Sequence, residues 1–240
     1  MRHLFLLLLY TYFGTCLLAQ SQVIKATENS IVKDSSGMIY PFNIWNALVM
    51  QGDYYLWSVD KQNVNTDFLL IKLTEEQKNK RLEKMPKPRE SAYFKTGIEF
   101  NPFKTKDINN NKINLKEEKG KIIVLNFWFI NCPPCRMEIP ALNEVVKTYK
   151  GNDSVKFIGI ALDGREELKQ FLKSFPFDYA IIENGRYLSE RYGVRSFPTH
   201  VIINQEGKIF FHTSGLAMNT VYWLKKTIAE LLSQSSVARQ

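Results

Sequence analysis

An apolar stretch over residues 122–129 places the strongest constraint on how this chain can fold. Apolar and polar side chains do not alternate along it, which indicates a strand that is covered on both faces of a sheet. A helical pattern follows over residues 133–150, and a second apolar stretch occupies residues 155–162. A strand, a helix and a further strand in this order predict a parallel pair joined by a crossover helix, and therefore an α/β fold.

The remainder of the second half of the chain extends this sheet. Further helices and a short strand are expected at residues 166–175, 179–182, 187–192 and 219–232. Residues 199–203 and 208–212 flank a stretch of turn-forming residues that ends in Gly207, and this arrangement predicts a hairpin. A hairpin added to parallel strands predicts a mixed central sheet with helices on both faces.

The first half of the chain has a different pattern. Apolar and aromatic stretches separated by turn-forming residues predict short strands at residues 31–32, 38–40 and 54–59. Thr74 and Gln77 have the spacing of a capping box, which predicts a charged helix that runs to Met85.

The prolines of residues 86–91 disfavour both a helix and a central strand, so this stretch is the expected linker. We therefore expect a signal peptide at residues 1–20, a small N-terminal extension domain at residues 21–90 and the main domain at residues 91–240. The role of the extension does not follow from its residues, since a substrate adaptor and a packing extension would have the same pattern.

The N-terminus has the layout of a secretory signal peptide. Arg2 precedes an unbroken apolar run at residues 4–9, and Thr11 and Gly14 interrupt the apolar stretch before it is long enough to span a bilayer. We therefore expect the protein to be exported, with the periplasm as its compartment. Cys16 leaves two alternatives open, which are membrane attachment as a lipoprotein through that cysteine and attachment through an uncleaved N-terminal anchor.

The composition is that of an ordinary globular protein, with 45% hydrophobic and 23% charged residues. The net charge of +8 would suit an acidic partner, but the lysines are spread over several polar stretches and form no arginine-rich stripe. We therefore expect no nucleic-acid partner. Removal of a signal peptide would leave two of the three cysteines, which are too few for a disulfide scaffold.

The remaining pair, Cys132 and Cys135, stands where the first buried strand gives way to a helix. A cysteine at a helix N-terminus lies near unpaired backbone N–H groups and the positive end of the helix dipole, which favour its thiolate. Cys132 is therefore the expected nucleophile, and Cys135, one turn further on, is the expected resolving cysteine. Pro133 and Pro134 suit the first helical positions because they lack N–H groups that would be orphaned there.

Half of a zinc site and a structural disulfide are the alternative interpretations of this pair. A zinc site needs two further ligands, and the chain offers His3, His200 and His212 besides its carboxylates. A Cys-x-x-Cys pair beside a strand and helix is the more specific signal of redox chemistry.

The residues around the pair resemble the TlpA/ResA branch of the thioredoxin superfamily. The similarity includes Asn126-Phe127-Trp128, the stretch from Cys132 to Pro140, and the later stretch from Tyr192 to Thr199. It covers about residues 94–232, with a lead-in at residues 97–103. The resemblance implies a thioredoxin fold and a thiol-disulfide oxidoreductase. The spacing of the two cysteines does not separate a reductase from an oxidase, and the resemblance favours reduction. The exchange of disulfides is expected to need no metal or organic cofactor.

The resemblance also implies roles for two residues far from the cysteines in sequence. Pro198 matches a cis-proline that lies against the cysteine pair and presents its backbone to the substrate, whereas an ordinary trans proline at a strand entry is the alternative. Phe197 would add surface beside the site, or pack in the core.

Glu138 lies three residues after Cys135 and therefore on the same helix face. In the resembling family a carboxylate at this position helps to move the proton of the resolving cysteine, a task that suits a partly buried acid. The alternative is a solvated charge on the helix surface.

Other residues near the pair are expected to have structural roles. Asn126 stands where thioredoxin has a buried aspartate, and an asparagine cannot carry the proton. Trp128 is expected beneath the active-site turn, or simply in the core, and Asn131 replaces a tryptophan that commonly precedes the first cysteine. His200 follows Pro198 in a strand, where a histidine is more often packed than catalytic.

These observations predict an exported enzyme that acts on disulfide-containing exported proteins. The substrate class stays open between an apocytochrome c, a folding protein with wrong disulfides and another oxidoreductase. In an oxidising compartment such a reductase needs re-reduction, so a membrane-embedded electron donor is the expected partner. Two alternatives remain open: a peroxidase of the same fold, and a binding module in which a thioredoxin-like domain only holds a partner.

Overall fold

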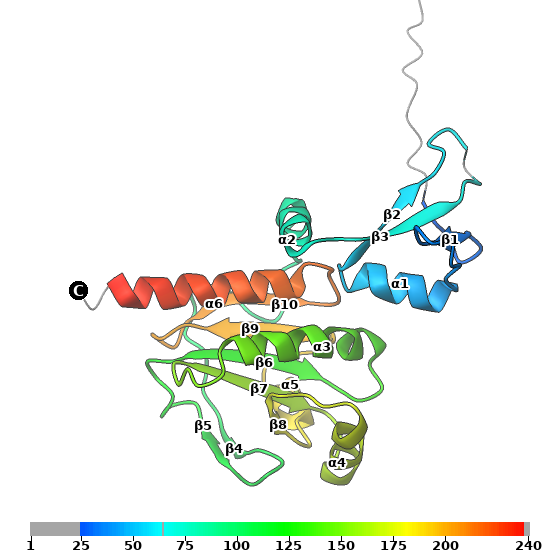
Figure 1. Ribbon diagram of the computed structural model, residues 1–240. Helices are drawn as coiled ribbons and strands as arrows, with labels where there is room; N and C mark the ends of the chain where they lie inside the picture. The colour runs from blue at the N-terminus through cyan, green and yellow to red at the C-terminus, as the bar shows by residue number, and fades with distance from the viewer. Residues whose placement is uncertain (1–24, 64, 238–240) are drawn as a thin grey trace, which may run out of the picture.

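A computed structural model describes residues 25–63 and 65–237, and the expected signal peptide with Cys16 lies outside them. Its centre is a five-stranded sheet in the order β10-β9-β6-β7-β8 (Figure 1). The parallel strands are β6 (Ile122–Trp128), β7 (Val155–Ala161) and β8 (Ala180–Ile182), and the antiparallel strands are β9 (Thr199–Ile203) and β10 (Ile209–Ser214). The expected mixed sheet is confirmed.

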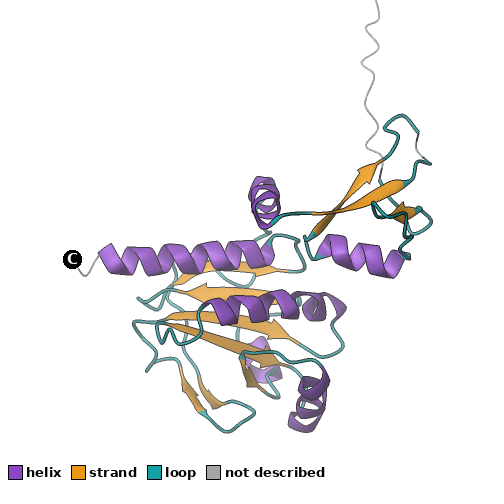
Figure 2. Cartoon of the chain, viewed as in Figure 1, coloured by secondary structure: helices purple, strands orange, loops and turns teal. Residues whose placement is uncertain are grey.

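Helices cover both faces of this sheet (Figure 2). On one face the core contains residues of α3 (Pro133–Thr148), α4 (Arg165–Ser174) and α6 (Thr220–Val237). On the other face Leu188 of α5 (Arg186–Arg191) packs with the aromatic residues that precede β6. All seven residues of β6 are buried, so the unbroken apolar stretch marks the strand that both layers cover.

The N-terminal elements form a second, smaller sheet in the order β1-β3-β2. Its strands are β1 (Val32–Lys33), β2 (Tyr54–Ser58) and β3 (Phe68–Lys72), and α1 (Phe42–Met50) packs against it. The sequence patterns predict neither β3 nor α1, and the strands expected at residues 38–40 and 54–59 leave the residues of α1 unassigned. The prediction of a strand at residues 38–40 is wrong, since that stretch makes only the isolated bridge between Lys33 and Ile39.

The predicted charged helix is confirmed as α2 (Glu75–Lys84). Thr74 Oγ1 accepts a hydrogen bond from the N–H of Gln77, and Gln77 Oε1 accepts one from the N–H of Thr74, so the capping box forms as expected. A short hairpin of β4 (Lys104–Lys106) and β5 (Lys112–Asn114), which the sequence did not reveal, lies below the main sheet in Figure 1.

The expected linker contains no helix or strand, but it is fastened to the main sheet. Thr213 Oγ1 donates to the carbonyl of Arg89 at 2.7 Å, and the N–H of Ser91 donates to His212 Nδ1 at 3.1 Å. Asn219, at the start of α6, donates to the carbonyls of Leu82 and Pro86. The division of the chain into domains at residue 90 stays a prediction.

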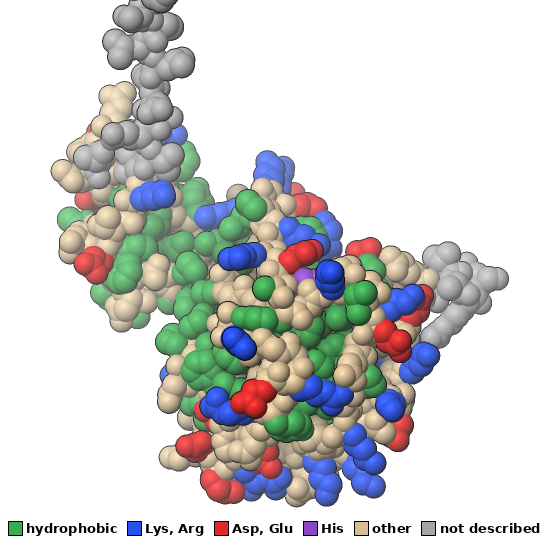
Figure 3. Space-filling view, turned by 180° about the vertical axis from the view of Figure 1, so that it is seen from behind, with side chains coloured by type: hydrophobic (Ala, Val, Ile, Leu, Met, Phe, Trp, Pro, Cys, Tyr) green, Lys and Arg blue, Asp and Glu red, His purple; other side chains and the backbone are tan. Residues whose placement is uncertain are grey.

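The two parts differ in their surfaces. Large apolar side chains that are exposed occur mainly in the N-terminal elements, at Ile31, Met38, Ile39, Phe42, Ile44, Trp57 and Val59. On the face shown in Figure 3, Lys and Arg side chains are interspersed with Asp and Glu over the main body. No helix of residues 25–63 and 65–237 is both long enough and apolar enough to cross a membrane.

Candidate active site

Cys132 and Cys135 form a disulfide at the junction of β6 and α3. Cys132 is the N-cap of α3, and its Sγ accepts a hydrogen bond from the N–H of Cys135 at 3.3 Å. The sequence at this point determines the helix start, because the two prolines occupy the first helical positions and need no hydrogen-bond partner there. The sulfur of Cys132 therefore lies at the positive end of a helix of 16 residues, an environment that stabilises its thiolate once the disulfide is reduced.

Each cysteine is only 2% exposed. Of the neighbouring residues, Asn131 and Pro133 are exposed and Pro134 is half-buried. Asn131, Pro133 and Pro134 are therefore more accessible to solvent than either cysteine.

Pro198 lies at the same end of the sheet. Thr199 pairs with Phe127 between the antiparallel strands β9 and β6. Continuing the same register by one residue places Pro198 opposite Trp128, next to the cysteine turn. The peptide bond between Phe197 and Pro198 is cis, as the resemblance implied. Phe197 is half-buried, and its ring meets that of Phe129 edge to face with 5.4 Å between centroids. Phe197 thus has a partly exposed face and a packing contact.

Glu138 is buried, with 5% of its surface exposed, so it is not a solvated charge on the helix. Its Oε2 lies 2.8 Å from His200 Nε2, and its Oε1 has no hydrogen-bond partner among the described residues. His200 in turn lies beside Asn126, whose Nδ2 is 3.2 Å from His200 Nδ1. A polar chain of three buried side chains therefore extends from the centre of the sheet to the helix face that carries Cys135.

The sheet register explains this chain. Asn126 and His200 are directly paired across β6 and β9, so their side chains leave the sheet on the same face. That face is the one covered by α3, which carries Glu138 three residues after Cys135. Sequence reasoning placed His200 in a strand but gave it no contact with Glu138, because the pairing of two strands 74 residues apart sets that contact.

Two aromatic residues complete the buried surroundings. Trp128 is buried beneath the cysteine turn and packs on Phe171 and Phe177, with centroid distances of 5.8 and 5.4 Å. Tyr179 is also buried, and burial, followed by the neighbouring Glu138 carboxylate, raises the pKa of its hydroxyl well above the usual value of 10.0. Tyr179 is therefore neutral at any working pH.

Asp163 is a site residue that sequence reasoning missed. Its Oδ2 accepts a hydrogen bond from the N–H of Ile130 at 2.8 Å and so holds the loop that leads to Cys132. Burial raises the pKa of Asp163, and the hydrogen bond from Ile130 opposes this rise. A signal was present in the sequence, since Asp163 follows β7 just as the cysteine turn follows β6, and parallel strands end at the same edge of a sheet.

Two grooves adjoin these residues. One, of about 310 Å³, includes Ile130, Asn131 and Asp163, and we call it the Asn131 groove. The other, of about 520 Å³, lies between the N-terminal elements and the main body, and we call it the Glu138 groove. Its walls are Met137, Glu138 and Pro140 of α3, residues of α2 such as Lys78 and Leu82, and the loop of residues 216–218.

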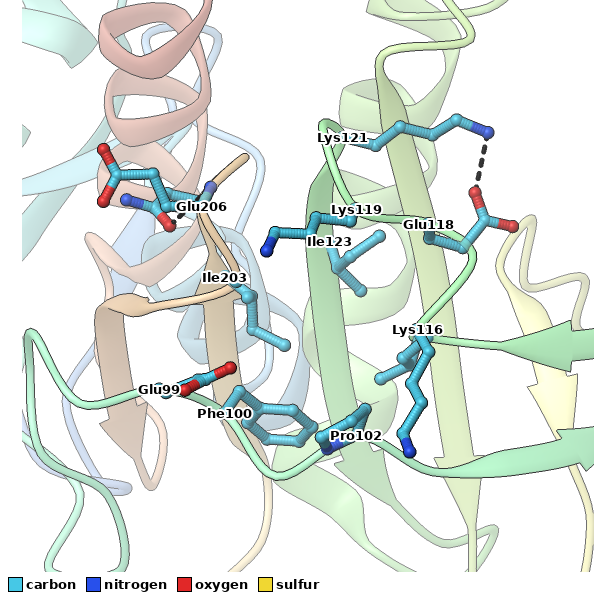
Figure 4. Close-up of a pocket in the computed structure, with 13 residues that line it drawn as sticks. Glu99, Phe100, Pro102, Lys116, Glu118, Lys119, Lys121, Ile123, Ile203 and Glu206 are labelled. Atoms are coloured by element: carbon cyan, nitrogen blue, oxygen red, sulfur yellow. Dashed lines mark hydrogen bonds and ion pairs between the residues drawn. The ribbon is translucent and has the colours of Figure 1, made fainter.

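A further pocket, of about 300 Å³, lies at the opposite end of the sheet (Figure 4). It includes Ile123 at the start of β6 and Ile203 at the end of β9, whereas the cysteines follow the end of β6. It is therefore separate from the candidate site. Within residues 25–63 and 65–237, no group of three or more His, Cys, Asp or Glu side chains is placed to hold a metal ion.

The structure brings most of the expected site residues together at one end of the sheet. These are Cys132, Cys135, Pro133, Pro134, Glu138, Asn126, Trp128, Phe197 and Pro198. His212 belongs to the opposite face, where its ring lies near that of Phe94, and His3 lies outside the described residues.

Known proteins show similar sequences and the same fold. Residues 96–212 match the sequence model of the AhpC/TSA family. The chain is 34% identical over 121 residues to the thiol-disulfide oxidoreductase ResA of Bacillus thuringiensis, which covers 50% of this chain and 69% of that protein. The ResA protein of Halalkalibacterium halodurans is 32% identical over 122 residues, with coverage of 50% and 69%.

A crystal structure of a Chlorobium tepidum protein described as a thiol:disulfide interchange protein DsbE superposes with a TM-score of 0.53 at 23% identity. It covers 57% of this chain and 98% of its own, and it establishes the shared thioredoxin fold. The buried disulfide at the start of α3 fits these relatives, and the protein is a thiol-disulfide oxidoreductase. The chain belongs to the ResA-like family of thiol-disulfide oxidoreductases.

Proposed function

We propose that this enzyme reduces disulfides of exported proteins through a dithiol cycle of Cys132 and Cys135. The observation that carries the proposal is the position of Cys132 at the N-terminus of α3, where its Sγ accepts the N–H of Cys135. This hydrogen bond and the helix dipole favour the Cys132 thiolate in the reduced enzyme, and the thiolate is the form that attacks a disulfide.

The cycle has two exchange steps. In the first, the Cys132 thiolate attacks one sulfur of the substrate disulfide, and the other sulfur leaves as a thiolate. In the second, Cys135 loses its proton to Glu138 and attacks Cys132 Sγ, which releases the reduced substrate and forms the Cys132–Cys135 disulfide. Two electrons pass from the enzyme to the substrate, so a new cycle requires a reductant.

The substrate would lie across the rim of the site. The exposed residues Asn131 and Pro133, the half-buried Pro134 and the half-exposed ring of Phe197 surround the disulfide. The Asn131 groove offers space for a polypeptide segment beside them. The backbone at Pro198 supplies the edge that a substrate strand would contact in our proposal, as the resemblance implies.

We place the enzyme outside the cytoplasm, in the periplasm, on the signal-peptide pattern of residues 1–20. A lipoprotein linked through Cys16 and an uncleaved anchor are the membrane-attached forms of the same proposal. The electron donor would be a membrane-embedded protein, because an oxidising compartment does not re-reduce the pair. Apocytochrome c is a candidate substrate class, as are misoxidised folding proteins.

The reduction potential of the Cys132–Cys135 pair tests the direction of the reaction. Equilibration of the purified protein in glutathione or dithiothreitol buffers, followed by thiol labelling, gives this potential. A value near or below about −270 mV is expected for a reductase, whereas a value near about −120 mV would make the enzyme an oxidant and overturn the proposal. The Cys132→Ser, Cys135→Ser double variant should lack disulfide reductase activity; if it kept the cellular role, a binding module would be the better description.

The match to the AhpC/TSA family also keeps a peroxidase as a second candidate. Consumption of hydrogen peroxide in the presence of a thiol donor would support it. We favour the reductase because the second cysteine lies one turn along the same helix as the first and already forms a disulfide with it.

A further inference from the structure

His200 is buried completely and contacts two residues of the candidate site, although the exchange steps described above make no use of it. Its Nε2 lies 2.8 Å from Glu138 Oε2, and its Nδ1 lies 3.2 Å from Asn126 Nδ2. Buried polar groups in native proteins are nearly always hydrogen-bonded, so the contacts of this imidazole determine where its proton can be.

The partner atoms assign the ring proton. In the amide orientation of the structure Asn126 Nδ2 faces His200 Nδ1, and because an amide nitrogen can only donate, this arrangement makes Nδ1 the acceptor. With Nδ1 as the acceptor, Nε2 is the donor in the contact with Glu138 Oε2. An aspartate in the place of Asn126 would accept instead and favour the other tautomer, so the asparagine at this position has a physical consequence.

This hydrogen bond distinguishes the two oxygens of Glu138. Oε2 is held by a donor from β9, whereas Oε1 is buried and has no partner among the described residues. A buried carboxylate is stabilised by each hydrogen bond it accepts, and its protonated form can place a proton on the oxygen that is not held.

We propose that His200 is a positioning residue for Glu138, holding Oε2 so that the other oxygen, Oε1, is presented to the proton of Cys135. The inference rests on the proposed function, since it concerns the step in which Cys135 resolves the mixed disulfide. In that step the Cys135 S–H bond breaks and its proton passes to Oε1. The electron pair on Cys135 Sγ forms the new bond to Cys132 Sγ, and the substrate sulfur leaves with the electron pair of the broken bond.

Several other polar and charged groups lie around Glu138. Asn126 carries no charge, and Tyr179 stays neutral because its pKa is raised. The Glu138 groove contains the further charged residues Asp53, Glu75, Lys78, Glu144 and Lys225. Of these, Lys78 is paired with Asp53, and Glu144 is paired with Lys147. His200 is thus the neighbour whose hydrogen bond reaches Glu138 directly.

Single-turnover reaction with the aromatic disulfide dithiobis(nitrobenzoate) separates the two exchange steps. Attack by Cys132 releases one coloured thiolate, and resolution by Cys135 releases the second. The full chain carries Cys16→Ser throughout, so that the colour comes from the active pair alone. The rate of each phase is recorded as a function of pH.

The apolar variant His200→Phe removes the donor to Oε2, so the carboxylate of Glu138 loses one stabilising hydrogen bond. We expect the half-maximal pH of the second phase to rise by about 1–2 units, from the loss of one hydrogen bond to a charged group. The first phase should keep its pH profile. His200→Gln places an N–H near the former position of Nε2 and should restore most of the profile, whereas His200→Asn is one methylene too short to do so.

Further variants make the result decisive. His212→Asn alters another buried histidine, on the opposite face of the sheet, and should leave both phases as in the unaltered protein. If Glu138→Gln slows the second phase but His200→Phe leaves its pH profile unchanged, the inference about His200 is wrong while the role of Glu138 stands.

If Glu138→Gln has no effect on the second phase, the role proposed for Glu138 fails, and the inference about His200 fails with it. If the double cysteine variant still releases both thiolates, the proposed dithiol cycle itself fails. If circular dichroism shows that His200→Phe does not fold, the test uses the comparison of His200→Gln with His200→Asn instead. Equal pH profiles of the second phase for these two variants would overturn the inference.

Discussion

Asn219→Ala should weaken the attachment of the N-terminal elements to the main sheet. Asn219 is 1% exposed, and its Nδ2 lies 3.3 Å from the carbonyl oxygen of Leu82 and 3.0 Å from that of Pro86. Leu82 belongs to the last turn of α2, where carbonyls have no partner within the helix. Asn219 therefore caps the C-terminal end of α2 from another part of the chain.

The magnitude follows from what the substitution leaves behind. Leu82 is buried, so its carbonyl would lose a partner that water replaces poorly, at about 1–3 kcal/mol. Pro86 is exposed, and its carbonyl can be hydrated with little loss. With a urea m-value of about 2 kcal/mol/M, this change lowers the unfolding midpoint by about 0.5–1.5 M.

Urea unfolding followed by circular dichroism, with proteolysis at residues 86–91 as a local probe, measures both effects. The matched control is Glu83→Gln, which removes the ion pair between Glu83 and Lys226 in the same contact of α2 with α6. Both of its side chains are largely exposed, so this variant should unfold like the unaltered protein. The reasoning would be refuted if Asn219→Ala had the same urea midpoint as Glu83→Gln and its linker were cleaved no faster than that of this control.

Three further predictions concern other parts of the molecule. Phe197→Ala should lower kcat/KM for a protein disulfide roughly 5- to 30-fold, because apolar contact beside the site is lost. The decrease in kcat/KM for the small disulfide dithiobis(nitrobenzoate) should be smaller. Equal decreases for the two substrates would argue against contact between Phe197 and the protein substrate. Burial lowers the pKa of His212 from 6.5, so the unfolded state binds its proton first, and the unfolding free energy should fall as the pH drops below 6.5 toward the lower folded value. His212→Asn should reduce that dependence in urea titrations on either side of pH 6.5. Gly185→Ala should destabilise the protein by about 1–3 kcal/mol, because the new Cβ would lie 2.5 Å from Ile160 Cγ2. The φ of −71° at this residue is ordinary, so the backbone adds no strain. An unchanged urea midpoint would contradict this prediction.

Much of the main sheet could be predicted from the chain because its elements have strong local patterns. The unbroken apolar stretch gave β6, the prolines gave the start of α3, and the turn that ends at Gly207 gave the hairpin of β9 and β10. The N-terminal sheet could not be predicted equally well. Its α1 has an apolar sequence that suits a strand as well as a helix, and packing of Trp45 against β3 decides between the two.

The site shows the same division between local and distant information. Cys132, Cys135 and Glu138 lie within one turn or two of the start of α3, so their spacing predicts that they share a helix end and a helix face. Their partners come from other strands. Asp163 reaches the loop before Cys132 from the end of β7, and His200 reaches Glu138 from β9.

The position of Asp163 follows from a general rule, because parallel neighbouring strands such as β6 and β7 end at one edge of a sheet. The position of His200 needs more than that rule. An antiparallel strand can pair with β6 in either of two alternations, and a shift by one residue would turn His200 to the opposite face, away from Glu138. The observed pairing of His200 with Asn126 fixes the alternation. The buried chain from Asn126 to Glu138 is thus a product of strand register, and a sequence becomes informative about it only once that register is known.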